Sequence, residues 1–160
     1  MIFYAIIPVK PYVKRFIENN YGNPVDFRKS PRENEMIKRM LKKPVHQHEK
    51  MYDTRLLRQS EVVEVMISDF EFYHYGWEIS KTDTIAFGKY FEKNAKYLMR
   101  TVVGLYVSFG VTVEKAINMF QERFNLEEEY WPYDSIKKDF YWISNYFASC
   151  YSERLTVFRN

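Results

Sequence analysis

Residues 82–109 read TDTIAFGKYFEKNAKYLMRTVVGLYVSF, and this stretch decides the helical half of the fold. Thr82 or Asp83 suits an N-cap, and Gly110 suits a helix stop. Between them, apolar residues recur at the spacing of one helical face. These residues are Phe87, Phe91, Leu98, Val102, Leu105 and Phe109. The pattern predicts one long amphipathic helix that buries this stripe.

Two further helices are predicted after Gly110. Thr112 suits the N-cap of a short helix to Phe124, and Asn125 suits a left-handed terminator. A turn from residue 126 to residue 132 leads to a final helix. The residues expected to be buried are Val113, Ala116, Ile117, Phe120 and Phe124 in the short helix, and Ile136, Phe140, Ile143 and Phe147 in the last. A long helix, a short helix, a turn and a final helix have the layout of a helix-turn-helix-like unit.

The first half of the chain has the pattern of strands and two helices. Residues 2–9 are apolar and predict a buried strand. Pro11 begins a helix that Gly22 ends, and Ser30-Pro31-Arg32-Glu33 has the pattern of a capping box for a second helix that ends at Pro44. Residues 61–77 are β-branched and aromatic, which predicts one or two strands that pair with the first. Residues 154–158 are a candidate edge strand.

These elements predict an α+β fold: a small antiparallel sheet with two N-terminal helices, followed by a three-helix, helix-turn-helix-like unit. The length of 160 residues suits a single domain, with residues 1–80 as the sheet-containing half and residues 81–160 as the helical half. Aromatic residues make up 19% of the chain, which is enough to build a well-packed core without disulfides.

The cellular compartment is indicated by the single cysteine and by the N-terminus. Cys150 has no partner for an intramolecular disulfide, which suits a reducing compartment. The apolar N-terminal run is too short for a signal peptide or a membrane span. We therefore expect a cytoplasmic protein of a host cell, without membrane association.

Charge is concentrated in residues 28–58, where ten Lys or Arg residues face four acidic ones, although the whole chain carries only +3. In the second predicted helix, the cations fall mostly off the apolar stripe. They are Arg32, Lys38, Arg39, Lys42 and Lys43. Such a surface can neutralise several phosphates. The alternative is an ordinary solvated helix face.

The final helix carries the second candidate surface, opposite its apolar stripe. The residues there are Lys137, Lys138, Tyr141, Trp142 and Asn145. Ammonium groups bind phosphates, and Tyr and Asn side chains reach base edges or backbone, so this face suits a nucleic-acid groove. The acidic residues 127–129 and Asp134 precede it and would repel phosphates. The alternative is a helical bundle that makes no nucleic-acid contact.

No reaction centre is recognisable in the sequence. His46, His48 and Asp53 have the side-chain types of a divalent metal site, but nothing local supplies further ligands and the nearby lysines disfavour a cation. His74 is interpreted as a strand residue, and Cys150, among aromatic residues, as a buried thiol. We therefore expect no enzyme activity, no metal centre and no cofactor. An enzyme built on His46, His48 and Asp53 is the weaker alternative.

Residues 113–124, VEKAINMFQERF, and residues 131–141, WPYDSIKKDFY, resemble small uncharacterised proteins carried by phages and mobile elements of Bacteroidota. Residues 84–145 are also similar, more distantly, to the C-terminal helix-turn-helix of Mor-type phage transcription activators, through the helix spacing and the run Ile136-Lys-Lys-Asp-Phe140. The resemblance implies sequence-specific DNA binding by a dimer, with Lys137, Lys138 and Tyr141 on the reading helix.

Together these observations predict a non-enzymatic, nucleic-acid-associated protein of a phage or mobile element, acting as a DNA-binding regulator or accessory factor. The alternative is a structural or assembly protein that acts through contacts with a protein partner or with copies of itself. Aromatic residues left outside the predicted stripes favour a partner surface of either kind. They are Tyr130, Trp131, Tyr133, Tyr141 and Trp142.

Overall fold

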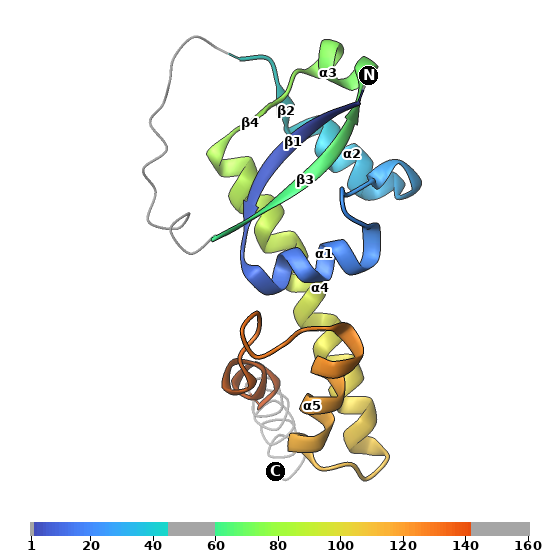
Figure 1. Cartoon of the computed structure of the whole chain (residues 1–160), viewed down its shortest axis with the longest axis vertical. Coiled ribbons are helices and arrows are strands. Elements are labelled where there is room, and N and C mark those ends of the chain that lie inside the picture. The colour runs from blue at the N-terminus through green and yellow to red at the C-terminus, as the bar shows by residue number, and fades with distance from the viewer. Residues whose placement is uncertain (1, 45–59, 142–160) are drawn as a thin grey trace, which may run out of the picture. The chain divides into compact units, whose positions relative to one another are not determined.

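The computed structural model describes residues 2–44 and 60–141. The chain divides into two compact units, Met1–Asn94 (unit 1) and Ala95–Asn160 (unit 2). The division falls inside one long helix, α4 (Lys81–Ser108; Figure 1), so residues 81–94 belong to unit 1 and residues 95–108 to unit 2. Helices and two antiparallel strand pairs make up the fold, which confirms the α+β class. The expectation of a single domain over residues 1–160 stays a prediction.

Unit 1 is built around an antiparallel pair of strands, β1 (Ile2–Val9) and β3 (Glu61–Ser68). Ile2 lies opposite Ser68 and Val9 lies opposite Glu61. Side chains alternate between the two faces of a strand, so one face of the pair is buried. Its buried residues are Ala5, Ile7, Val9, Val63, Val65 and Ile67. The predicted pairing of the first strand with the strand beginning at Glu61 is confirmed.

The helices between these strands begin where the prolines predict. Pro11 is the first residue of α1 (Pro11–Tyr21), and Pro31 is the first of α2 (Pro31–Met40), because proline's missing N–H is not needed at this position. Gly22 ends α1 with φ at 87°. The predicted capping box at Ser30 is wrong, since its side chain makes no capping hydrogen bond. Ser30 instead closes the preceding 3-10 turn, η1 (Phe27–Lys29), and its ψ of 87° is not that of a capping residue.

Residues 69–75 were predicted as strand and form a helix instead, α3 (Asp69–Tyr75). Ser68 and Glu71 make a reciprocal capping box: the Glu71 N–H donates to Ser68 Oγ at 3.2 Å, and the Ser68 N–H donates to Glu71 Oε2 at 2.8 Å. Two donors at the helix start are thereby satisfied, which outweighs the strand preference of the aromatic residues. His74 consequently lies on an exposed helix surface and not in a strand.

A second strand pair connects the end of α2 to the residues after α3. β2 (Leu41–Lys42) pairs antiparallel with β4 (Glu78–Ile79). Because β2 follows α2 directly, the helix ends at Met40 and the backbone is extended before Pro44 is reached. Leu41 of β2 is buried in the core of unit 1.

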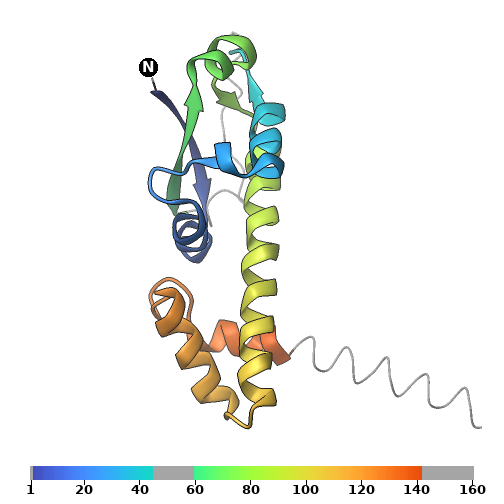
Figure 2. The same cartoon turned by 90° about the vertical axis from the view of Figure 1, so that its right-hand side faces the viewer.

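The core of unit 1 joins the β1–β3 pair to the first half of α4. Phe87 and Phe91 of α4 are fully buried among the inward residues of both strands. The Phe91 ring stacks on Phe27 of η1 with centroids 5.7 Å apart. Figure 2 shows the strands beside this part of α4. Large aromatic rings therefore supply much of the apolar area that unit 1 removes from water.

The buried stripe of α4 differs from the predicted one beyond Phe91. Its members are Thr84, Phe87, Phe91, Ala95, Met99 and Val103. From Phe91 these residues are four apart, and such a row is inclined to the helix axis and packs into the groove of a neighbouring element. The predicted stripe ran straight along the axis instead. The expected burial of Leu105 and Phe109 is therefore wrong, and Phe109 is 78% exposed.

Unit 2 confirms the two predicted helices after Gly110. α5 (Val113–Phe124) begins at Thr112, whose side chain accepts a hydrogen bond from the Lys115 N–H, and ends at Asn125 in the left-handed conformation. A final helix begins at residue 133 and is described to residue 141. The core of the unit consists of Ala95, Met99, Val103, Ala116, Ile117, Phe120, Leu126, Trp131 and Ile136. Ile143, Phe147 and residues 154–158 lie outside the described residues.

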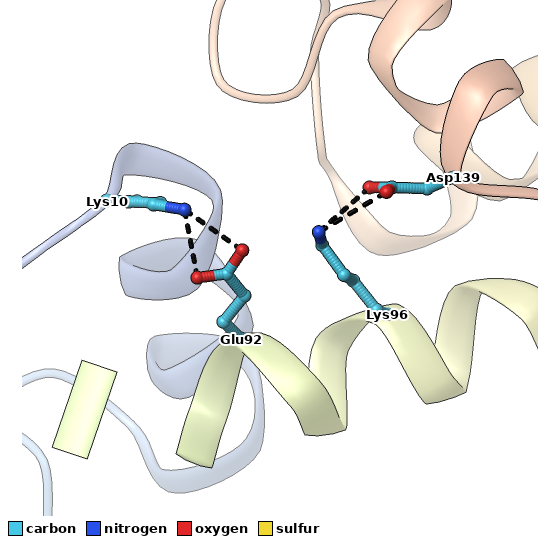
Figure 3. Close-up of polar contacts among 4 residues, drawn as sticks. All are labelled: Lys10, Glu92, Lys96 and Asp139. Carbon is cyan, nitrogen blue, oxygen red and sulfur yellow. Dashed lines mark hydrogen bonds and ion pairs between the residues drawn. The ribbon is translucent and has the colours of Figure 1, made fainter. Parts of the chain in front are cut away.

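Each unit has an ion pair to α4, on successive turns of that helix (Figure 3). In unit 1, Lys10 Nζ lies 2.9 Å from both carboxylate oxygens of Glu92. In unit 2, Lys96 Nζ lies 3.2 Å from Asp139 Oδ2 of the final helix. The final helix is therefore held to α4 by charge as well as by the burial of Ile136.

Candidate nucleic-acid interface

The final helix of unit 2 presents the first predicted surface. Ile136 is fully buried, and the adjacent Lys137 and Lys138 are exposed. Tyr141, one turn beyond Lys137, is 42% exposed. Lys137 Nζ lies 5.7 Å from the centroid of the Tyr133 ring, which favours a fixed position for this ammonium group. The structure thus brings Lys137, Lys138 and Tyr141 to one side of the helix. Trp142 and Asn145 lie outside the described residues.

The acidic turn before this helix has a structural role. Glu128 Oε2 accepts a hydrogen bond from the Tyr133 N–H at 2.9 Å, at the first residue of the helix. A carboxylate here satisfies a free backbone donor and interacts favourably with the helix dipole. The three carboxylates at residues 127–129 are all exposed. Glu127, Glu129 and Asp134 therefore remain in solvent near the lysines and limit the positive potential there.

Trp131 was expected to be available to a partner, and this expectation is wrong. The side chain is only 2% exposed and meets the Phe120 ring edge-on, with centroids 6.0 Å apart. The Trp131 carbonyl accepts a hydrogen bond from Gln121 Nε2 at 2.9 Å. Tyr130 and Tyr133 are half-buried. The turn thus folds back onto α5 and uses its indole as a core residue, so the aromatic surface of this region is smaller than predicted.

The basic residues of α2, of β2 and of the position after β2, all in unit 1, form the second predicted surface. Several of them have partners within the chain. Lys38 Nζ lies 2.8 Å from Glu35, and Lys42 Nζ lies 2.9 Å from Asp83. The guanidinium of Arg32 lies 5.3 Å from the centroid of the Tyr90 ring. Arg39 and Lys43 are exposed and have no hydrogen-bond or ion-pair partner within residues 2–44 and 60–141. The cations available to a polyanion are therefore fewer than the sequence suggested.

A hollow of about 570 Å³ lies between α2 and the start of α4. Arg32 and Arg39 line it together with Glu35 and Asp83, so its charges nearly balance. On its wall, the Tyr90 hydroxyl donates to Glu33 Oε1 at 2.8 Å. The pKa of Tyr90 is raised above its ordinary value, mainly by burial and secondly by this hydrogen bond. A hollow with two cations and two carboxylates lacks the excess positive charge of a phosphate site.

Sequence reasoning missed a third group of exposed side chains, on and after α3. Phe70, Tyr73 and Trp77 are large aromatic residues with 65%, 69% and 44% of their surface exposed. They were assigned to strands, in which alternate side chains turn inward. The sequence held one signal against this assignment: Ser68-Asp-Phe-Glu71 has the spacing of a capping box, which places a helix start here.

The outward face of the β1–β3 pair is largely apolar, although the exposed Glu64 lies opposite Ile6 on it. Ile2, Tyr4 and Ile6 of β1 and Val62 of β3 are all exposed on it. Soluble monomers seldom leave several large apolar residues adjacent on one surface, and such patches favour contact with another protein.

The predicted metal residues His46, His48 and Asp53 lie outside the described residues, as does Cys150. Within residues 2–44 and 60–141, the structure holds no group of three or more His, Cys, Asp or Glu side chains placed to bind a metal ion. Over the same ranges, none of the helices combines the length and the apolar character that crossing a membrane requires.

No protein-family model matches the chain, and no curated protein or solved structure is significantly similar to it.

Proposed function

We propose that this chain is a non-enzymatic protein that associates with nucleic acid through the final helix of unit 2, as a DNA-binding regulator or accessory factor. The observation that carries the proposal is the joint exposure of Lys137, Lys138 and Tyr141. Ammonium groups contact phosphates and position a protein on a duplex, and a phenol one turn further on can donate to phosphate or to a base edge.

The anchoring of this helix supports the same proposal. Glu128 caps its first residue, Ile136 is buried beneath it, and Asp139 is paired with Lys96. A helix held by three different contacts presents its exposed face in a fixed orientation, as a groove-binding helix requires. We also propose that the protein acts in the cytoplasm of a host cell. Its assignment to a phage or mobile element is supported by the sequence resemblance alone.

The proposal is tested by fluorescence anisotropy with labelled duplex DNA at low and at physiological salt. We expect binding that weakens as salt rises, because bound lysines release counterions from the duplex. Each lysine–phosphate contact adds about 0.9 to the slope of log affinity against log salt. Replacing both Lys137 and Lys138 with Gln should therefore lower this slope by about 2.

Lys115→Gln is the matched control, because Lys115 is an exposed lysine of the same unit on α5. It should bind duplex DNA as the unaltered protein does. Absence of binding at low salt would contradict the proposal. An equal loss in the control and in the Lys137→Gln/Lys138→Gln variant would contradict the assigned surface.

A structural or assembly role is the second candidate, favoured by the exposed apolar face of the β1–β3 pair. Ile6, at 64% exposed, lies on this face. If the face meets another copy, light scattering should give a mass above that of the monomer, and Ile6→Lys should return the mass to the monomer value. A monomer at all concentrations would count against this role.

A further inference from the structure

We propose that the hollow of about 570 Å³ between α2 and the start of α4 binds a small organic monocarboxylate with an apolar body. The guanidinium of Arg39 binds the carboxylate, and the side chains of Met36 and Met40 contact the rest of the molecule. The site lies in unit 1 and its ligand is not a nucleic acid, so the inference does not depend on the proposed function.

Two helices of unit 1 form the walls of this hollow. Asp83 and Tyr90 line it from α4, about two helical turns apart. The residues that line it from α2 are spaced so that they share one helical face. Those that the argument uses are Arg32, Met36, Arg39 and Met40. The volume is within the range of about 300–1,000 Å³ that is typical of small-molecule sites.

The two carboxylates that line the hollow have lysine partners that do not line it. Lys38 Nζ lies 2.8 Å from Glu35 Oε1, and Lys42 Nζ lies 2.9 Å from Asp83 Oδ2. Each carboxylate therefore has a cation of its own, so Arg39 does not serve as the counterion of either one.

Arg39 is the guanidinium that remains for a ligand. It is exposed, it lines the hollow, and it makes no hydrogen bond or ion pair within residues 2–44 and 60–141. Its planar group can donate two parallel hydrogen bonds to one carboxylate. Arg32 also lines the hollow, but its guanidinium lies 5.3 Å from the centroid of the Tyr90 ring, which favours a fixed position at that wall.

The uncharged part of the lining favours a ligand with a hydrocarbon body. Met36 is half-buried and Met40 is 8% exposed, and both line the hollow together with Tyr90. Thioether side chains adapt to apolar groups of varied shape. The Tyr90 hydroxyl already donates to Glu33 at 2.8 Å, so Tyr90 offers a ligand its ring and not its hydroxyl proton.

The charge around the hollow fits a carboxylate better than a phosphate. Four cations and three carboxylates line the hollow or bond to residues that do, which leaves an excess of one positive charge. One carboxylate balances this excess, whereas a phosphate group carries about 1.5–2 negative charges near neutral pH. The seven residues are Arg32, Lys38, Arg39, Lys42, Glu33, Glu35 and Asp83.

The test titrates the full chain with sodium 4-phenylbutyrate in a calorimeter, because this probe joins one carboxylate to an apolar body. Two control probes separate these features: 4-phenyl-1-butanol has the same body without the charge, and acetate has the charge without the body. We expect phenylbutyrate to bind at least about tenfold more tightly than phenylbutanol, since hydrogen bonds to charged groups are the stronger ones. Acetate should bind more weakly than phenylbutyrate as well.

Arg39→Gln should lower the affinity for phenylbutyrate roughly 10- to 100-fold, because it removes the charged donor. Arg39→Lys keeps the charge but not the two parallel donors, so its affinity should lie between the two. Lys89→Gln is the matched control: it removes one exposed charge from α4 in the same unit, and Lys89 does not line the hollow. It should bind phenylbutyrate as the unaltered protein does.

The methionine methyl signals in an NMR spectrum locate the ligand directly. In protein with isotope-labelled methionine methyl groups, phenylbutyrate should shift the signals of Met36 and Met40. The signal of Met99, which is buried in unit 2, should stay in place. Met66 of β3 belongs to the same unit as the hollow but does not line it, so its signal reports whether Arg39→Gln keeps its fold.

Several results would overturn the proposal. They are the absence of phenylbutyrate binding at millimolar concentration, equal affinity for phenylbutanol, full affinity in Arg39→Gln, and an equal loss in Lys89→Gln. Displacement of phenylbutyrate by an equal concentration of inorganic phosphate would make the hollow a phosphate site instead. Binding of a peptide with a free C-terminal carboxylate, without binding of phenylbutyrate, would replace the small molecule with a protein partner.

The inference and the proposed function fail separately. The Lys137→Gln/Lys138→Gln variant should bind phenylbutyrate as the unaltered protein does, and Arg39→Gln should keep its binding to duplex DNA. Loss of phenylbutyrate binding in the double lysine variant would overturn the assignment of the ligand to the hollow in unit 1.

Discussion

Gly76 lies directly against the backbone of Lys42. Its φ is +105°, and a side-chain carbon placed on it would overlap the carbonyl group of Lys42 and the nitrogen of Lys43. The next residue completes the contact with the Trp77 N–H bond to Lys42. One glycine therefore allows the end of α3 to meet β2.

Gly76→Ala should destabilise unit 1 more than Gly22→Ala does. Both glycines have a positive φ and an extended ψ, a conformation that costs other residues about 1–3 kcal/mol. Only at Gly76 does steric overlap with backbone add to this cost, because the nearest atom to a carbon on Gly22 is 3.7 Å away. Urea unfolding measures both variants. Equal losses of stability in the two variants would show that the backbone of Lys42 moves aside at little cost.

Ser68→Ala should lower the free energy of unfolding by about 1 kcal/mol, because it removes the cap of α3. Ser30→Ala is the control: this serine also precedes a helix, yet its side chain makes no capping bond, so the change should stay within about 0.5 kcal/mol. Thermal unfolding followed by circular dichroism compares the two. A larger loss at Ser30 would mean that its side chain caps α2 in solution.

Phe91→Ala should cost about 3–5 kcal/mol, since it leaves a cavity in the core of unit 1. Phe109→Ala should change stability by no more than about 0.5 kcal/mol, because that ring is exposed. Both residues belonged to the predicted stripe of the long helix. Chemical denaturation distinguishes the inclined row of buried residues from the straight one, and similar costs for the two variants would favour the straight stripe.

Stability should also fall in acid through Asp26. Hydrogen bonds from the Arg28 side chain and backbone lower the pKa of Asp26 from 3.8 to about 2. A folded-state pKa below the unfolded one stabilises the protein fully above the unfolded value, and this stabilisation is lost as pH falls through about 2. The contribution is below about 1 kcal/mol, because the pair is partly solvated. Asp26→Asn should flatten the stability profile between about pH 4 and pH 2, and an unchanged profile would contradict this role.

Elements with local start and stop signals were predictable from the sequence. Pro11 and Gly22 bound α1, and Thr112 and Asn125 bound α5, because each acts through its own backbone conformation or a nearby hydrogen bond. α3 was missed because strand preference was weighed above the spacing of Ser68 and Glu71. The tilt of the buried row in α4 was not predictable, since it depends on which elements pack against that helix.

Some features of the candidate surfaces were likewise predictable from local sequence, and others were not. Exposure of Lys137 and Lys138 follows from the helical position of Ile136, so the sequence predicted it. Pairing of Lys42 with Asp83 joins residues far apart in the chain, and no local pattern indicates it. Trp131 was misassigned because a residue in a turn can still be a core residue when the turn folds back on its own helix.

The register of β1 with β3 also bears on how the protein is made. β1 leaves the ribosome before its partner, residues 61–68, which is synthesised only after both intervening helices. The core that covers β1 further requires Phe87 and Phe91, which come later still. During this interval the apolar strand has no native partner, a state prone to aggregation. Chaperone dependence during translation should therefore concentrate in unit 1, while the described contacts of unit 2 form within a shorter span of chain.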